Sequence, residues 1–224
     1  MSSSAILPGP LETLKVFMQM TISEGFWPSL GHTLLRGLFG FLIAILASLI
    51  IGIPAGIYSG IDAFFSPILI IIRSTPVISI ILLALIWFQV DRVPIFIGFL
   101  TMFPILTTNI TQGIKSIDRG LFEMAKVYQV PGKRILREIY LPGIVPFIYS
   151  GLITATGFGW RAIIIGEVLS QPRYGIGSMM QQAQSYLLVS EVISWTLVAV
   201  IIGFIFEQLL KKGKKGWIKW DTND

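Results

Sequence analysis

Residues 37–61 read GLFGFLIAILASLIIGIPAGIYSGI and contain no charged side chain. An α-helix needs roughly 20 mostly apolar residues to cross the hydrocarbon core of a bilayer. Because lipid offers the backbone no hydrogen bonds, only helices and closed barrels span membranes. A barrel strand would instead show about ten residues of alternating polarity. This stretch therefore predicts a transmembrane helix and an all-α integral membrane protein.

The same reasoning predicts five transmembrane helices in total, because further apolar runs follow the first along the chain. The composition agrees, since only 13% of the 224 residues are charged, whereas soluble domains carry about 25%. These helices form one membrane domain over residues 34–210. The predicted spans cover about residues 34–58, 64–88, 94–114, 141–166 and 190–210.

The basic residues predict how these helices are oriented. Lysine and arginine concentrate in the loop 115–140 and in the tail 211–224. Such residues favour the cytoplasmic side of apolar spans. Five spans place both segments on one side, so the C-terminus is predicted to be cytoplasmic and the N-terminus to lie outside. Residues 1–33 then form an outer segment, whose mixed polarity predicts an interfacial helix or partial insertion into the membrane.

The residue inventory excludes several classes of protein. With no cysteine and a single histidine, the chain is not expected to hold a metal. It has no glycine-rich phosphate loop ending in Lys-Ser or Lys-Thr, so any ATP must bind to another subunit. No catalytic constellation is present, and we expect neither an enzyme nor a cofactor in this chain. The basic residues flank apolar spans, so nucleic acid is not an expected partner.

The loop between the third and fourth predicted spans carries the most specific pattern. Residues 123–142 read EMAKVYQVPGKRILREIYLP. A short amphipathic helix is predicted over about residues 121–130, ending at Pro131-Gly132, because proline and glycine interrupt helices. The alternative interpretation is a charged loop that is simply solvated.

This pattern resembles the cytoplasmic coupling loop of binding-protein-dependent ABC importer permeases. In that family Glu-Ala-Ala is followed by three residues, a glycine, nine residues and Ile-x-Leu-Pro. Met124 replaces an alanine, and Gln129 stands where the family has its glycine, so Pro131-Gly132 is expected to supply the turn. The matching positions are Glu123, Ala125, Ile139, Leu141 and Pro142. The resemblance implies an ATPase contact at Glu123, Met124, Ala125, Gln129, Pro131 and Gly132.

The resemblance extends over about residues 6–210 and implies an assembly. Gly159-Trp160-Arg161 with Glu167, followed by Gly175-Ile176-Gly177, is similar to the nitrate, sulfonate and taurine branch. The family implies a type I importer permease fold in the bacterial inner membrane, surrounded by lipid. Its partners would be two cytoplasmic ABC ATPase subunits, a second permease copy (identical or paralogous) and an extracytoplasmic solute-binding protein.

The resemblance does not fix the solute. Arg73 and Arg161 favour a small organic anion, such as a sulfonate, taurine or a nitrate-like solute, whereas related branches of the family also imply a vitamin precursor. The alternative function is an ATP-independent secondary transporter or channel. That alternative explains the apolar spans equally well, but it does not explain the spacing of the loop. Secondary transporters also tend to be built from internal repeats, and none is visible here.

Polar residues inside the predicted spans are candidates for the solute path, because ionisable groups in a membrane usually face a protein interior or water. Arg73-Ser74-Thr75 precedes Pro76 and interrupts the second span; a simple kink is the alternative. Arg161 and Glu167 are either pathway residues or partners in helix packing, but they lie about 120° apart around a helix. The candidates are Arg73, Ser74, Thr75, Asn109, Arg161 and Glu167.

Overall fold

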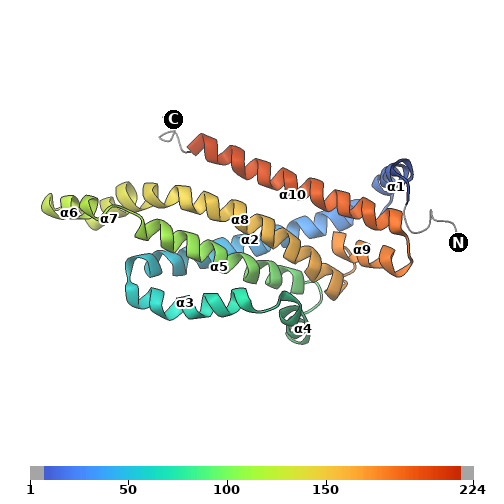
Figure 1. Cartoon of the computed structure of the whole chain (residues 1–224), viewed down its shortest axis with the longest axis horizontal. Helices are drawn as coiled ribbons and strands as arrows, with labels where there is room; N and C mark the ends of the chain where they lie inside the picture. Colours follow the sequence, from blue (N-terminus) through green and yellow to red (C-terminus); the bar gives the residue numbers. More distant parts are fainter. Residues whose placement is uncertain (1–7, 218–224) are drawn as a thin grey trace. The chain divides into compact units, whose positions relative to one another are not determined.

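The computed structural model describes residues 8–217, without the side chains of 119 and 214–217. Every regular element in this range is helical (Figure 1). In chain order the elements are α1 (Pro10–Ile22), α2 (Phe26–Ile57), α3 (Ser59–Ser74), α4 (Val77–Trp87), α5 (Val93–Lys115), α6 (Arg119–Val127), α7 (Gly132–Ile135), the π-helix η2 (Leu136–Tyr140), α8 (Leu141–Ser170), α9 (Ile176–Ser185) and α10 (Val189–Trp217).

Apolar helices occupy all five predicted positions. Four are long and apolar enough to cross a membrane, namely Phe26–Ile57, Val93–Lys115, Gly132–Ser170 and Val189–Gly213. The remaining position holds α3 and α4, which bend by 98° at their junction and make a fifth span if taken together. The break falls at Thr75 and Pro76, where the sequence predicts an interruption. Proline removes a backbone donor and thereby ends a regular helix.

Two boundaries differ from the prediction. The first long helix begins at Phe26, so the predicted end of the outer segment at residue 33 falls inside α2. Thr33 and Arg36 lower the local hydropathy, but both are buried with polar partners. At the other end, α10 continues through the basic block to Trp217, because lysine is a good helix former. The rest of the predicted basic tail (218–224) and residues 1–7 lie outside the described residues.

The chain divides into two units. Unit 1 comprises Met1–Leu42, Thr75–Phe99 and Gly157–Phe206. Unit 2 comprises Ile43–Ser74, Leu100–Thr156 and Glu207–Asp224.

Unit 1 is built around buried tryptophans. The rings of Phe26 and Trp195 stack with centroids 5.2 Å apart. The Trp160 indole nitrogen donates to the carbonyl oxygen of Ala199 at 2.9 Å, which satisfies the one polar group of this side chain. A Cβ at Gly203 would lie 3.0 Å from Trp160 Cδ1. The lack of a side chain at Gly203 therefore lets α10 pack closely on this ring.

Unit 2 depends on close approach between α2 and α5. A Cβ added at Gly56 would lie 2.6 Å from Cβ of Ile114, and one at Gly52 would lie 3.0 Å from Cγ2 of Ile110. At this contact, the hydroxyl of Thr111 donates to the carbonyl oxygen of Gly52 at 3.2 Å. Small residues and interhelical hydrogen bonds are what joins helices in lipid, where the hydrophobic effect contributes little.

Candidate functional site

The predicted coupling loop forms a short capped helix, α6. Its N-terminus is capped by the Asp118 side chain, which accepts a hydrogen bond from Gly120 N at 2.8 Å. At the other end, Val130 N donates to the carbonyl oxygen of Ala125 at 2.9 Å, and Gln129 N donates to that of Lys126 at 3.1 Å. These two bonds make a Schellman motif, in which the first residue after the helix cap has a left-handed backbone conformation.

Gln129 is that left-handed residue, with φ of 51°. The expectation that Pro131-Gly132 supplies the turn is therefore wrong, because Pro131 instead caps the N-terminus of α7. Glycine adopts this conformation without strain, whereas a residue with a Cβ is destabilised. The geometry thus gives a physical reason for a glycine at this position of the motif.

One side of α6 is apolar and exposed. The exposed fractions are 42% for Leu121, 53% for Met124, 78% for Val127 and 76% for Tyr128, which follows the helix. Ala125, in contrast, is 4% exposed. Apolar side chains gathered on a surface mark an interaction site. The other predicted coupling residues, Glu123, Gln129, Pro131 and Gly132, are also exposed.

An aromatic contact joins α6 to the beginning of α8. The rings of Phe122 and Tyr140 lie 4.9 Å apart between centroids. Both side chains also line a cavity of about 420 Å³, together with Gly56 and Ile57 at the end of α2. Tyr140 belongs to the π-helix η2, directly before Leu141-Pro142. Pro142 has no amide hydrogen to donate to Glu138, and a wider turn accommodates this gap.

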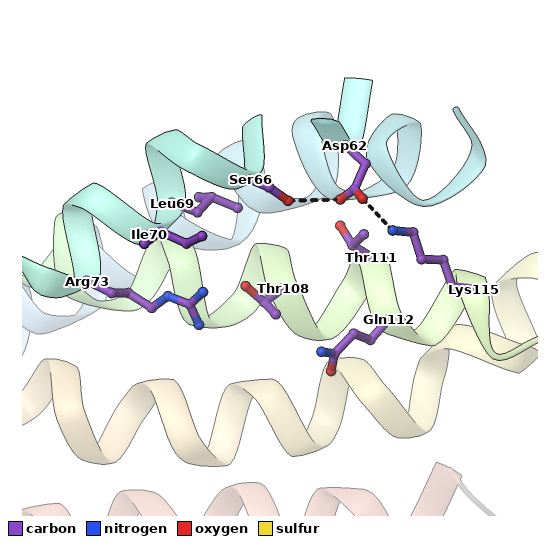
Figure 2. A pocket seen from close by; sticks show the side chains of 9 residues that line it. All are labelled: Asp62, Ser66, Leu69, Ile70, Arg73, Thr108, Thr111, Gln112 and Lys115. Atoms are coloured by element: carbon purple, nitrogen blue, oxygen red, sulfur yellow. Dashed lines mark hydrogen bonds and ion pairs between the residues drawn. The ribbon is translucent and has the colours of Figure 1, made fainter. Parts of the chain in front are cut away.

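A polar pocket of about 190 Å³ lies between α3 and α5 in unit 2 (Figure 2). The Lys115 ammonium and the Asp62 carboxylate form an ion pair across it. Arg73 enters from α3 beside Thr108 of α5 (Figure 2) and has no ion-pair partner within residues 8–217. The lining residues are Asp62, Ser66, Leu69, Ile70, Arg73, Thr108, Thr111, Gln112 and Lys115.

Glu167 lies in a different environment, fully buried in unit 1. Its carboxylate accepts from Arg36 Nη1 at 2.6 Å, from the Thr33 hydroxyl at 2.9 Å and from Gly177 N at 3.0 Å. Arg161 is exposed and is no partner of Glu167. Of the two interpretations of Glu167, the structure thus favours helix packing, with Arg36 as the partner.

Arg36 joins two more segments to this cluster. Its Nη1 also donates to the carbonyl oxygen of Tyr174 at 2.7 Å, and its Nη2 meets Asp91 Oδ1 at 2.6 Å. Sequence reasoning missed both Arg36 and Asp91 as partners of this site. A signal was available, because a charge in an apolar helix needs a countercharge and few carboxylates adjoin the spans.

The glycines after α8 form the cradle of Glu167. A Cβ at Gly175 would lie 2.7 Å from the carboxyl carbon of Glu167, and one at Gly177 would lie 2.7 Å from Glu167 Cβ. The Gly175-Ile176-Gly177 motif is thereby explained as space for a buried carboxylate.

Two more predicted pathway residues form hydrogen bonds within their own helices. The Asn109 amide donates to the carbonyl oxygen of Ile105 on its own helix at 2.9 Å. The Ser74 hydroxyl likewise donates to the carbonyl oxygen of Ile70 at 2.6 Å. Thr75 lies in the break between α3 and α4. Of the six candidates, only Arg73 lines the polar pocket.

Residues 44–210 match the family described as "binding-protein-dependent transport system inner membrane component". The chain belongs to this family. It is 30% identical to the putative aliphatic sulfonates transport permease protein SsuC of Escherichia coli, over 98% of this chain and 83% of that protein. It is 27% identical to the taurine transport system permease protein TauC of the same organism, over 97% and 81%.

The bicarbonate transport system permease protein CmpB of Synechococcus elongatus is 27% identical over 93% of this chain and 80% of that protein. A chain of the MetNI methionine ABC transporter shares the fold, with a TM-score of 0.58 at 16% identity over 87% of this chain and 97% of that one. The predicted all-α importer permease fold and membership of the sulfonate and taurine branch are confirmed. The chain is thus a multi-pass inner-membrane permease, and its relatives are transport permeases.

Proposed function

We propose that this permease imports a small anionic solute and is driven by a separate cytoplasmic ATPase that docks on α6. The observation that carries the proposal is the exposed apolar side of α6 (Leu121, Met124, Val127 and Tyr128). Exposed apolar side chains gathered on one side of a helix mark a surface that binds a partner. A groove on the ATPase is the partner that the spacing of the loop motif favours.

The contacts of α6 explain how docking would move the membrane domain. α6 is capped at both ends, and we expect it to move as one element. Phe122 transmits that motion to Tyr140, at the beginning of α8. The ATP-driven closing of the ATPase is therefore passed through an aromatic contact to a long membrane helix.

The rest of the assembly follows from the same proposal. Two ATPase subunits bind the ATP, two permeases (identical or paralogous) enclose the solute path, and an extracytoplasmic binding protein delivers the solute. The N-terminus lies outside, and the basic end of α10 lies in the cytoplasm. We expect no catalytic chemistry and no cofactor in the permease itself.

The class of solute is inferred from the relatives and from the charges in the chain. The relatives are named for aliphatic sulfonates, taurine and bicarbonate, which all carry an oxyanion group. Arg73 lines a polar pocket and has no countercharge within the described residues, so it can attract such an anion. The import of a small oxyanion therefore accounts for both observations.

The absence of cysteine from the natural chain allows a direct test of docking. Met124→Cys is labelled with a thiol-reactive photo-crosslinker in the permease co-expressed with its ATPase. We expect crosslinks to the ATPase whose yield changes when ATP is added. Gln184→Cys, exposed in α9, is the matched control and should give none.

The same two variants test the orientation of the permease in the membrane. A membrane-impermeant thiol reagent added to whole cells should label Gln184→Cys and spare Met124→Cys. Equal crosslinking of the ATPase at both positions, or none at Met124→Cys in a folded complex, would overturn the docking proposal.

A further inference from the structure

We infer that the pocket between α3 and α5 is an anion subsite that holds a singly charged oxyanion at Arg73. The inference rests on the proposed import of an anionic solute, and it adds the position, the charge and the size of the binding site. All nine residues that line the pocket belong to unit 2.

The charges of the pocket leave one cation uncompensated. Arg73, Lys115 and Asp62 are its ionisable lining residues. Asp62 is paired with Lys115, and Figure 2 shows this pair at the opposite end of the pocket from Arg73. The net charge is therefore +1, located on the guanidinium. A single negative charge completes the balance.

The hydrogen-bond donors proposed to bind the anion are those of the Arg73 guanidinium. A planar guanidinium presents paired N–H groups that match two oxygens of an oxyanion. The Thr108 hydroxyl is already used, because it donates to the carbonyl oxygen of Pro104 at 2.7 Å. The Arg73 guanidinium is thus the proposed anion-binding group.

The size of the pocket limits the ligand. A volume of about 190 Å³ equals roughly six water molecules at about 30 Å³ each. Sites for drug-sized molecules begin at about 300 Å³. The pocket therefore fits an anion of a few heavy atoms, such as nitrate, bicarbonate or methanesulfonate.

The Asp62–Lys115 pair adds selectivity by charge. Because Asp62 already neutralises Lys115, a dianion would meet only one uncompensated positive charge, that of Arg73. Its second charge would also approach the carboxylate of Asp62, and like charges repel. The pocket should thus distinguish a monoanion from sulfate of similar size.

The test uses Ile70→Cys in the permease copurified with its ATPase. Ile70 lines the pocket and is 57% exposed, and it lies three residues before Arg73 on the same helix face. Two methanethiosulfonates of similar size are compared, one with a sulfonate group and one with a trimethylammonium group. We expect Arg73→Gln to lower the ratio of the anionic to the cationic labelling rate about tenfold.

Protection by small ions tests the ligand class. Methanesulfonate and nitrate should slow the labelling of Ile70→Cys by neutral N-ethylmaleimide, whereas sulfate and choline should not. Arg73→Lys keeps the charge and should keep the reagent ratio, but the loss of the planar guanidinium should weaken protection. This conservative variant also serves if Arg73→Gln fails to fold.

Arg161→Gln is the matched control, because it removes an exposed arginine outside the pocket and should leave the ratio unchanged. No labelling at all, a ratio indifferent to Arg73→Gln, or equal protection by sulfate would overturn the subsite. ATPase copurification is measured on the same samples. Its loss with a normal labelling ratio contradicts only the docking proposal, so the two failures are distinguishable.

Discussion

Arg36 and Arg73 both lie in apolar helices, yet they have opposite environments. Arg36 is 4% exposed and is surrounded by Glu167, Asp91 and the carbonyl oxygen of Tyr174. Arg73 is exposed at a pocket and has no carboxylate partner within residues 8–217. The difference teaches that a charge in a membrane helix has two stable solutions. It is either fully partnered, and then part of the architecture, or exposed without a countercharge, and then available to a ligand.

Energetics separates the two regions further. Breaking a buried ion pair leaves an uncompensated charge, which costs about 3–5 kcal/mol. An exposed pair contributes only about 0–1 kcal/mol, and Lys115 in its pair with Asp62 is 46% exposed. The unit 1 cluster should therefore govern stability, while the unit 2 pocket should govern what is bound.

The largest expected effect comes from Glu167→Gln. It removes the buried countercharge of Arg36 and leaves only the exposed carboxylate of Asp91. We expect a loss of about 3–5 kcal/mol in the free energy of unfolding. Thermal unfolding of the detergent-solubilised permease measures it as a lower Tm. Arg161→Gln is the control, because Arg161 is exposed and has no ion pair within the described part of the chain. Equal Tm values for the two variants would break the comparison.

A smaller effect is expected when the cradle is filled and the charges are kept. Gly175→Ala places a Cβ 2.7 Å from the carboxyl carbon of Glu167. We expect a loss of about 1–3 kcal/mol from overpacking, measured by the same unfolding assay. Gly157→Ala is the matched control, because nothing lies within 4 Å of its added Cβ. In a helix that change should stabilise by about 0.5–1 kcal/mol, and a loss there would contradict the account.

The smallest effect is expected at helix ends with a left-handed backbone conformation, which occur in both units. Each has a helix that ends in a left-handed residue with a side chain, namely Leu187 after α9 (φ 56°) in unit 1 and Gln129 after α6 (φ 51°) in unit 2. Gln129→Gly and Leu187→Gly should each stabilise the adjoining helix by about 1 kcal/mol. Slower amide hydrogen exchange in α6 and α9 is the measurement. Tyr128→Gly, at φ of −81°, should have the opposite sign.

Sequence reasoning succeeded where the determining signal is local. Long apolar runs predicted the membrane-spanning helices, and Pro76 predicted the break between α3 and α4. The coupling loop was recognised by its spacing, which residues 123–142 preserve almost completely. These features depend on neighbours in the chain, so a single sequence contains them.

The rest depends on partners that are distant in the sequence. Arg36 meets Asp91 and Glu167 across 55 and 131 positions, and no local pattern encodes such a meeting. The beginning of α2 at Phe26 was missed for the same reason, because tertiary partners compensate for Thr33 and Arg36. The conformation of Gln129 was missed because propensity alone disfavours it.

The π-helix η2 has a consequence for insertions and deletions in this chain. A π-turn contains about one residue more than the α-turn that would replace it. If one residue within Leu136–Tyr140 is deleted, this turn can become α-helical. The side chains of α8 then keep their orientation around the helix axis. The same deletion further along α8 would rotate every later side chain by about 100°. The short segment before Pro142 is therefore where the length of the coupling loop can vary without changing which side chains face the helix neighbours.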